Sequence, residues 1–401
     1  MVVNQGSGIN WSISNSKIQM TGNWDYTLTV IGIKSSDSGT LDAKADDVSL
    51  SVSFTLGEDA DGHPTIASTD CSCHIGLLTV EDYGHASWFY NILLKVFAGL
   101  IRLDVERLVC IEARHAIDLD ADEALKTFQL QTVIEKNWLL DYRLVAAPAF
   151  GAGYVESFHK GEFFSVADKS EAPFSPSPVP SPAWTPRMMT IWLSDYVANT
   201  AGYALFEHGA LEFNISKDDV PPEYRKLFDT TCPSSEICIG RLIPHLAIEY
   251  PNASVVLRAG AVAPPTVDVN ATGAFGDLEG SGDYYVRLSD DRSPVYVFRT
   301  AVSIRAELEV SIDGQAIKVK AVSLRSNVTV VNSTIGPIPT FFTSVVVGIL
   351  PKALIPLINR VGDKGFPLPN IKSVEYVNAM LVQEERNVCL MMDVKYTGKR
   401  R

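Results

Sequence analysis

The sequence predicts an α+β protein made of two halves, each combining antiparallel strands with a long helix. Three observations lead to this fold class. Apolar and polar residues alternate over long stretches of both halves, which is the period of a strand with one face in water. Apolar residues at helical spacing follow these strands. Residues 172–186 contain six prolines, which indicates a stiff, extended connector between the halves.

The composition is that of a folded, acidic protein. Of the 401 residues, 46% are hydrophobic and 20% are charged, which excludes a disordered chain and allows two or three domains. The net charge of −13 argues against general nucleic-acid binding, because neutralising phosphates requires a basic surface. Residues 1–170 hold 12 Lys and Arg against 23 Asp and Glu, so the acidity is concentrated in the first half.

The first half is expected to begin with strands and continue into one long helix. Serine and threonine alternate with apolar residues over much of 9–83, which predicts antiparallel strands. From Ser87 to about Lys126, apolar residues recur every three or four positions, which predicts an amphipathic helix. Two more strand-like runs lead to Lys160. Together these elements form a predicted N-terminal domain, residues 1–170.

The second half is expected to repeat this organisation with a different sequence. A Pro-rich linker is placed at 171–188 and a C-terminal domain at 189–401. The predicted elements are helices near 191–208 and 221–250, strands from about 253 to 330, a helix from about 338 to 361, and two closing strands. In both halves, a wide apolar helix face beside a curved sheet could enclose an apolar cavity or could pack as an ordinary filled core.

Several features indicate a secreted protein. No run of 18 or more apolar residues supports a membrane span, because polar residues and prolines interrupt the most apolar segment, Phe341–Pro356. The N-terminus shows no signal peptide. Even so, six Asn-x-Ser/Thr glycosylation sequons occur, at Asn10, Asn214, Asn252, Asn270, Asn327 and Asn332. We therefore expect an extracellular glycoprotein whose N-terminal segment is missing from this sequence.

Chemistry-bearing motifs are absent from the sequence. There is no GxSxG, HExxH or GxxxxGK[ST] motif, and the seven histidines show no metal-ligand spacing. The six cysteines include no CxxC pair, which favours disulfides over zinc. We expect no catalytic residue, no metal and no cofactor other than bound lipid. The protein is therefore predicted not to be an enzyme.

Four motifs resemble those of the family of bactericidal/permeability-increasing protein and lipopolysaccharide-binding protein, which also includes lipid transfer proteins. In chain order they are Ser12-Ile-Ser-Asn-Ser-Lys-Ile, Trp192-Leu-Ser-Asp-Tyr-Val-Ala-Asn-Thr-Ala-Gly202, Ile335-Gly-Pro-Ile-Pro339 and Lys364-Gly-Phe-Pro-Leu-Pro369. The resemblance implies a boomerang of two barrel-plus-long-helix domains joined through a central antiparallel sheet. Each domain would hold a lipid in an apolar pocket.

The resemblance also assigns roles to residues. Cys71 and Cys110 correspond to the family's single disulfide, whereas Cys232 and Cys238 are only close enough in sequence to close a small loop, and Cys73 and Cys389 are unassigned. We expect lipid contacts from the helices, with ordinary core packing as the alternative for each residue. The candidates are Trp88, Ile92, Val96 and Leu100 in the first half and Tyr196, Phe342, Val346 and Ile349 in the second.

Two departures from the family pattern matter. Family members begin with further residues that line the first pocket, so we expect the first domain to be N-terminally truncated and its pocket open on one side. The hairpin tip carries lysines in the antibacterial members, but here the tip holds only Lys34 as a cation. Apolar insertion through Trp24 and Tyr26 would then replace electrostatic capture of lipid phosphates.

The predicted function is non-enzymatic lipid binding in innate immunity. The protein would sequester acyl chains of lipopolysaccharide or phospholipid, with an antimicrobial role. The alternative is a phospholipid or neutral-lipid transfer protein without that role. Expected partners are bacterial lipopolysaccharide or phospholipid and, transiently, a membrane surface; no nucleic acid is expected, and the protein is expected to be a monomer.

Overall fold

The computed structural model describes residues 1–30, 33–84, 87–134, 136–180, 187–288, 293–313, 316–368 and 374–397. The chain divides into two compact units. Unit 1 comprises Met1–Thr132 and Asp141–Lys160, and unit 2 comprises Val133–Leu140 and Gly161–Arg401. The predicted α+β class is confirmed. The predicted domain boundaries and the boomerang layout stay predictions, and residues 181–186 of the linker lie outside the described residues.

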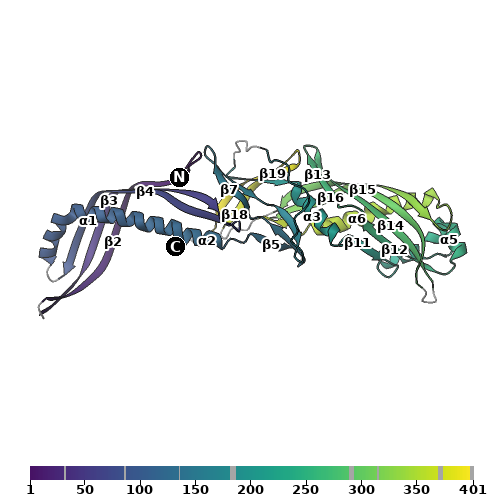
Figure 1. The fold of residues 1–401 in the computed structure, drawn as a ribbon, viewed down its shortest axis with the longest axis horizontal. Helices are drawn as coiled ribbons and strands as arrows, with labels where there is room; N and C mark the ends of the chain where they lie inside the picture. The colour runs from purple at the N-terminus through teal and green to yellow at the C-terminus, as the bar shows by residue number, and fades with distance from the viewer. Residues whose placement is uncertain are drawn as a thin grey trace. The chain divides into compact units, whose positions relative to one another are not determined.

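Unit 1 contains one antiparallel sheet of long strands (Figure 1). Its order follows the chain: β1 (Val2–Asn4), β2 (Gly8–Val30), β3 (Ile33–Glu58) and β4 (Pro64–Gly84). These are the strands predicted in residues 9–83. The turn between β3 and β4 contains Gly62 at φ +88°, and a Cβ there would collide with the carbonyl oxygen of Leu144. Glycine is therefore required at this turn.

The predicted helix follows β4. It consists of α1 (Ser87–His115), a π-helical turn (Ala116–Ala121) and α2 (Asp122–Lys126), so its predicted end points are confirmed. The region up to Ser165 holds more strands than the two predicted. They are β5 (Gln131–Ile134), β6 (Trp138–Asp141), β7 (Leu144–Phe150), β8 (Val155–His159) and β9 (Glu162–Ser165).

Unit 2 contains a seven-stranded sheet and a three-stranded sheet. The larger sheet has the order β11 (Glu212–Ile215), β12 (Ser254–Ala261), β14 (Gly273–Arg287), β15 (Val295–Asp313), β16 (Ala316–Ser333), β17 (Phe366–Pro367), with β13 (Thr266–Asn270) paired to β14. The smaller sheet has the order β10 (Met189–Ser194), β19 (Asn387–Tyr396), β18 (Val374–Glu384). The predicted strands of 253–330 and the two closing strands are confirmed.

The helices of unit 2 correct part of the prediction. α3 (Tyr196–Glu207) and α6 (Thr340–Gly362) lie within about two residues of the predicted positions, except that 191–194 belongs to β10, whose alternating residues pair with β19. The helical segment predicted near 221–250 is present but is not continuous. It is broken into a 3₁₀ turn (Pro222–Phe228), α4 (Ile239–Leu242) and α5 (Pro244–Glu249). Prolines and a disulfide loop interrupt the helical pattern there.

The two units differ in how much apolar core they contain. In unit 2 a large cluster gathers buried side chains around Phe298, Ile243 and Leu246. In unit 1 the cluster under the long strands is small and centres on Ala45, Val48 and Ile75. α1 contributes only the half-buried Val105 to this cluster. Most apolar residues of α1 are therefore not used to build the described core of unit 1.

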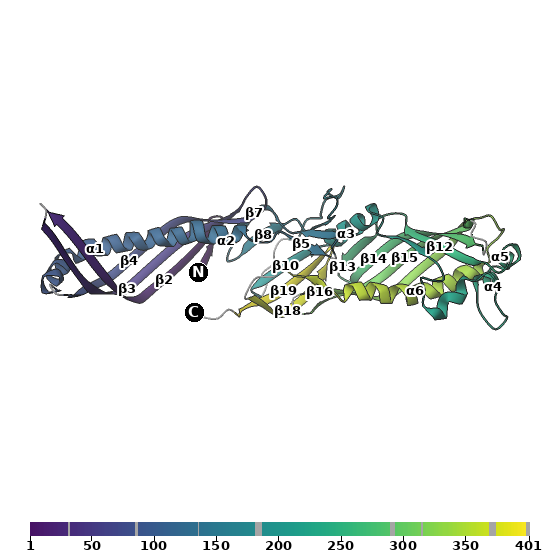
Figure 2. The same cartoon turned by 90° about the horizontal axis from the view of Figure 1, so that it is seen from below.

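The long helix of each unit runs along one strand of its sheet (Figure 2): α1 along the edge strand β4, and α6 along β16, which pairs with β17 only at Ala316 and Ile317. In unit 2, the side chain of Asn359 on α6 binds the backbone of Ala321 on β16. The Ala321 N–H donates to Oδ1 at 2.7 Å, and Nδ2 donates to the Ala321 carbonyl at 3.3 Å. An asparagine thus occupies the place of a neighbouring strand.

Candidate functional site

Polar side chains attach α1 to the free edge of β4 in unit 1. The Asp82 N–H donates to Asn91 Oδ1 at 2.7 Å, and Asn91 Nδ2 donates to the Asp82 carbonyl at 3.1 Å. Further along, the Ile75 N–H donates to Glu106 Oε1 at 2.8 Å. The Asn91 contact repeats the geometry of Asn359 in unit 2. The edge of β4 is therefore satisfied by helix side chains rather than by another strand.

The attachment continues past the π-helical turn. The Ser68 N–H donates to Asp118 Oδ1 at 2.5 Å, and the Ile66 N–H donates to Asp122 Oδ1 at 3.0 Å. Hydrogen bonds from the Lys126 ammonium and the Ile66 N–H hold the pKa of Asp122 below its usual range. A disulfide joins Cys71 on β4 to Cys110 on α1, the pairing that the family resemblance implies. One line of contacts thus fixes the helix along most of β4.

Replacing Asn91 with alanine is expected to lower the free energy of unfolding of unit 1 by about 1–3 kcal/mol, because two backbone groups of the buried Asp82 lose their partner. Urea unfolding measures this loss, and hydrogen exchange at the Asp82 amide locates it. The matched control is Asn23→Ala on β2, whose side chain is exposed and accepts one hydrogen bond from Thr40. Equal losses in the two variants would contradict the role given to Asn91.

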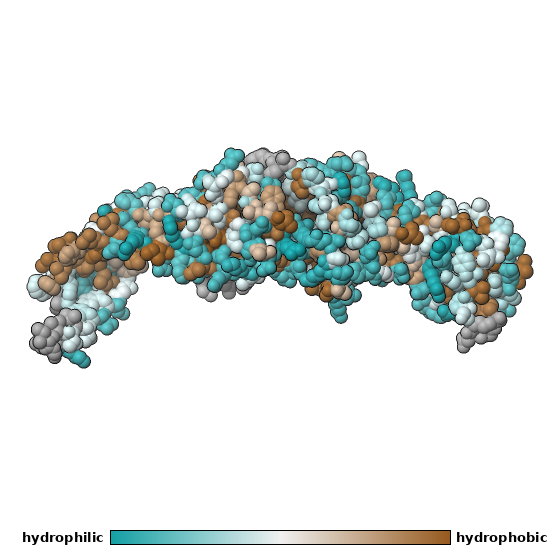
Figure 3. Space-filling model, viewed as in Figure 1, coloured by the Kyte–Doolittle hydropathy of each residue, from teal (hydrophilic) through white to brown (hydrophobic). Residues whose placement is uncertain are grey.

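An apolar stripe on α1 faces away from this line of contacts. No residue of α1 is buried. The stripe is visible as a hydrophobic area over α1 in Figure 3. Its exposed members are Trp88, Phe89, Ile92, Leu93, Val96, Phe97, Leu100, Leu103, Leu108 and Ile111. Contiguous apolar surface of this kind marks a binding surface for lipid or protein.

The predicted lipid-contact residues of the first half all lie on this stripe. Trp88 and Val96 are each 71% exposed, and Ile92 and Leu100 are more than half exposed. No described side chain of unit 1 covers them enough to bury them. The structure therefore places these four residues on an open helix face and not inside a closed pocket.

The predicted residues of the second half divide into two kinds. Phe342 and Tyr196 are buried by protein: Phe342 packs edge-on against Tyr284 and Phe298, and Tyr196 packs against Phe174. Ordinary core packing was the alternative for both. Val346 lies half-buried at the margin of the core, and Ile349 on α6 is 37% exposed. Neither of the latter two is fully buried.

α6 is also largely exposed along its length. By length and composition alone, it is long and apolar enough to cross a membrane. Phe342 near its start and Gly362 at its end are buried in unit 2, and Phe341, Leu357 and Val361 are exposed. A Cβ at Gly362 would overlap the carbonyl oxygen of Val319, which keeps the end of the helix close against β16.

The hairpin residues expected to insert into a lipid surface have internal partners. Trp24 Nε1 donates to Asp82 Oδ1 at 2.6 Å, and the Trp24 ring stacks on Tyr26 and meets Tyr90 of α1 edge-on. Trp24 therefore links the hairpin to the start of α1. Lys34 is exposed, while Ile31 and the side chains of Leu28 and Val30 lie outside the described part of the hairpin.

The sequons and the remaining cysteines are distributed over both units. Asn214, Asn252, Asn327 and Asn332 are exposed. Asn10 donates to the hydroxyls of Ser51 and Ser53, and Asn270 accepts hydrogen bonds from Thr272, so both amides are engaged. Cys232 and Cys238 form a second disulfide. Burial raises the pKa of the free thiols of Cys73 and Cys389.

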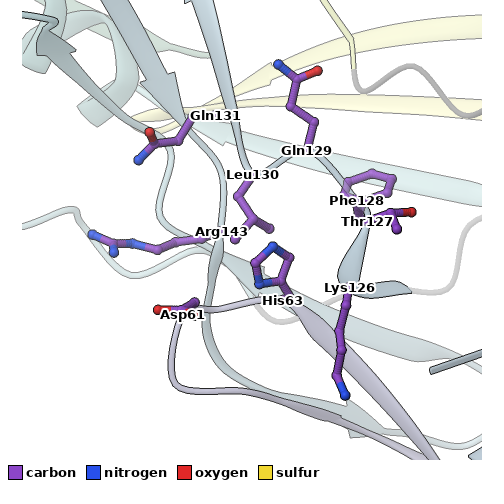
Figure 4. A pocket seen from close by; sticks show the side chains of 9 residues that line it. All are labelled: Asp61, His63, Lys126, Thr127, Phe128, Gln129, Leu130, Gln131 and Arg143. Carbon is purple, nitrogen blue, oxygen red and sulfur yellow. The ribbon is translucent and has the colours of Figure 1, made fainter. Parts of the chain in front are cut away.

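One polar cavity in unit 1 lies beside the turn between β3 and β4 (Figure 4). Its volume is about 430 Å³, and its lining includes Asp61, His63 and Arg143. Asp59, Asp61 and His63 bring ligand atoms within 4.8 Å of one another and could hold a metal ion. The sequence signal for this cluster is the placement of the three residues at every second position, and the sequence analysis did not identify it. Because Asp59 accepts the N–H groups of Asp61 and His63, turn formation alone accounts for the cluster.

Two family models together match most of the chain. Residues 1–121 match the N-terminal domain of the LBP / BPI / CETP family, and residues 132–396 match the C-terminal domain. The chain is 25% identical over 395 residues to the bactericidal permeability-increasing protein of Sebastes schlegelii, covering 98% of this chain and 81% of that protein. It is 26% identical over 397 residues to the lipopolysaccharide-binding protein of Homo sapiens, covering 98% and 79% respectively.

A solved structure shares the fold. The crystal structure of lipopolysaccharide binding protein aligns with 99% of this chain and 85% of that chain, with a TM-score of 0.57 and 23% identity.

Proposed function

Because the chain belongs to the LBP / BPI / CETP family, we propose that it binds the acyl chains of lipopolysaccharide and related bacterial lipids outside the cell, in innate recognition and without catalysis. The observation that carries the proposal is the exposed apolar stripe of α1. Polar side chains and a disulfide attach one side of α1 to the sheet. The apolar face of the helix is therefore left for a ligand.

The dimensions of the stripe suit acyl chains. From Trp88 to Ile111 an α-helix rises about 35 Å, longer than a single extended acyl chain of the usual length. Burying a methylene contributes about 0.8 kcal/mol, so two chains of about 16 carbons contribute on the order of 25 kcal/mol relative to water. The same gain is available in a bilayer. Exchange between membrane and protein is therefore nearly neutral and needs neither a nucleotide nor a chemical step.

Val96→Asp is expected to weaken binding of a fluorescent fatty acid and of lipopolysaccharide by at least about tenfold, because a carboxylate on the stripe must be desolvated by the bound chain. Val96 is 71% exposed, so the variant can fold. The matched control is Val145→Asp on β7, an exposed valine of the same unit away from α1. Titration by fluorescence measures both, and equal affinities in the two variants would contradict a role for the stripe.

Lipid transfer without an antibacterial role is the second candidate, favoured by charge. Residues 1–82 carry three lysines and eleven acids, a surface that repels lipid phosphates at close range. Movement of a fluorescent phospholipid between two populations of neutral phosphatidylcholine vesicles tests this candidate. If the protein moves phospholipid between these vesicles at least as readily as it binds lipopolysaccharide, the second function is favoured over the first.

A further inference from the structure

One side of α6 forms a continuous exposed face in unit 2. Its residues recur at alternating intervals of three positions and one position, which places them on one side of an α-helix. They are Ile349, Lys352, Ala353, Pro356, Leu357 and Arg360, and we call them the α6 face. α6 belongs to unit 2, whereas the segment expected to precede this sequence belongs to the first domain.

The other side of α6 is fixed to the protein. Near the start of the helix, Phe342 is buried and Val346 packs against the core of unit 2. At its end, Asn359 binds the backbone of β16, and the buried Gly362 lies against the same strand. No residue of the α6 face belongs to a described core cluster. The α6 face is therefore surface that the described part of unit 2 leaves open.

The α6 face carries two cations and no acid. Lys352 and Arg360 are the only charged residues of Thr340–Gly362. Neither of them forms an ion pair with another described residue. Asp363, the acid that follows the helix, lies 3.6 Å from the ammonium of Lys320. The α6 face is therefore a local positive surface in an acidic protein, and it attracts anions.

We propose that the α6 face docks on the surface of an anionic phospholipid bilayer. Ile349 and Leu357 enter the apolar layer, and Lys352 and Arg360 pair with lipid phosphates. Apolar residues and cations on one helix, without acids, are typical of helices that lie in a membrane interface. Each cation follows one of the two apolar residues by three positions, so the two are neighbours on the helix surface. The long stems of lysine and arginine let the charge reach the head groups while the aliphatic groups are buried.

The spacing of the cations suits a surface that carries many phosphates. Lys352 and Arg360 are eight positions apart, which is a rise of about 12 Å along an α-helix. Side chains that extend outward keep this separation, so each cation contacts a different head group. The second half of the chain does not oppose such contact, because residues 171–401 hold 22 Lys and Arg against 24 Asp and Glu and are almost neutral.

Co-sedimentation of the 401-residue protein with vesicles tests the proposal. The protein should bind phosphatidylcholine vesicles that contain phosphatidylserine more strongly than vesicles of phosphatidylcholine alone. Lys352→Gln and Arg360→Gln should each lower the partition coefficient on the anionic vesicles about fivefold, since a basic residue at such a surface contributes about 1 kcal/mol. Lys352→Arg should keep the original value within about twofold. Leu357→Ser should lower it at least about fivefold, because the serine has no aliphatic group to insert.

Matched controls exist for both kinds of change. Lys395 is exposed on β19, in the smaller sheet, so Lys395→Gln removes the same charge from another part of unit 2. Phe213 on β11 is 50% exposed, close to the 48% of Leu357, so Phe213→Ser removes comparable apolar surface away from α6. Both controls should leave the partition coefficient within about twofold of the original.

The outcome is independent of the lipid site proposed on α1. Val96→Asp, which alters that site, should leave partition into both kinds of vesicle within about twofold. Equal partition of the unaltered protein into anionic and neutral vesicles would overturn the proposal. A loss in Val96→Asp or Lys395→Gln as large as that in Lys352→Gln would overturn it too, because the membrane contact would then lie elsewhere or depend on net charge alone.

Discussion

Replacing Phe342 with alanine is expected to lower the free energy of unfolding of unit 2 by about 3–5 kcal/mol, the range for truncating a buried phenylalanine. The ring is 3% exposed and lies 5.4 Å from the ring of Phe298 and 5.7 Å from that of Tyr284, measured between centroids. Those two rings stack on each other at 4.1 Å. Loss of the Phe342 side chain leaves a cavity between the first turn of α6 and the sheet. Urea unfolding of the purified variant measures the change.

The neighbouring residue provides the control. Phe341 is 65% exposed and belongs to the same turn of α6, so Phe341→Ala removes the same group without opening a cavity. Its effect should stay within about 0.5 kcal/mol. Similar losses at the two positions would show that helix formation, and not core packing, depends on these rings.

Removing the disulfide of unit 1 is expected to have a comparable effect. Cys71 and Cys110 are separated by 39 positions, and closing a loop of that length restricts the unfolded chain by about 4 kcal/mol in the entropy model. A Cys71→Ser, Cys110→Ser double variant should lose about this amount from unit 1. Hydrogen exchange at the amides of β4, measured at increasing concentrations of urea, reports the stability of unit 1.

The second disulfide gives the comparison. Cys232 and Cys238 close a loop of only six positions, for which the same model gives about 2 kcal/mol, and the loss should fall on unit 2. A variant lacking this bridge should leave exchange in β4 unchanged. A larger effect from the short loop than from the long one would contradict the entropic account.

The long helices were predictable because their apolar period extends over many turns. α1 with its extension ends at Lys126, and α6 begins at Thr340, within about two residues of the predicted positions. The segment 221–250 failed because its apolar residues also follow a helical period, while Pro244 and the bond between Cys232 and Cys238 act against a continuous helix. The proline is a break that the sequence itself shows, whereas the disulfide depends on how the chain folds.

The site was predictable only in part. The apolar face of α1 follows from spacing alone. The sequence therefore predicts that Val96 and Leu100 lie on an apolar surface, which either protein or ligand must cover. Spacing does not say whether protein or ligand supplies that partner, and for Phe342 the protein does. The polar attachment through Asn91 and Glu106 was not found, since it depends on β4 being the last strand of its sheet. Edge position is a property of topology and leaves no local mark in the sequence.

The π-helical turn Ala116–Ala121 changes the direction in which the following side chains of the helix point relative to β4. Each α-helical residue rotates the side-chain direction by about 100°, so the twelve positions from Glu106 to Asp118 would leave Asp118 about 120° away from the direction of Glu106. The wider π turn rotates less per residue and removes part of this excess. Asp118 and Asp122 can then still reach the N–H groups of Ser68 and Ile66. Deleting one residue of this turn before Asp118 would leave eleven steps of a regular α-helix, which end only about 20° from the direction of Glu106. The π turn therefore lets the helix carry one additional residue while both carboxylates stay on the side of β4.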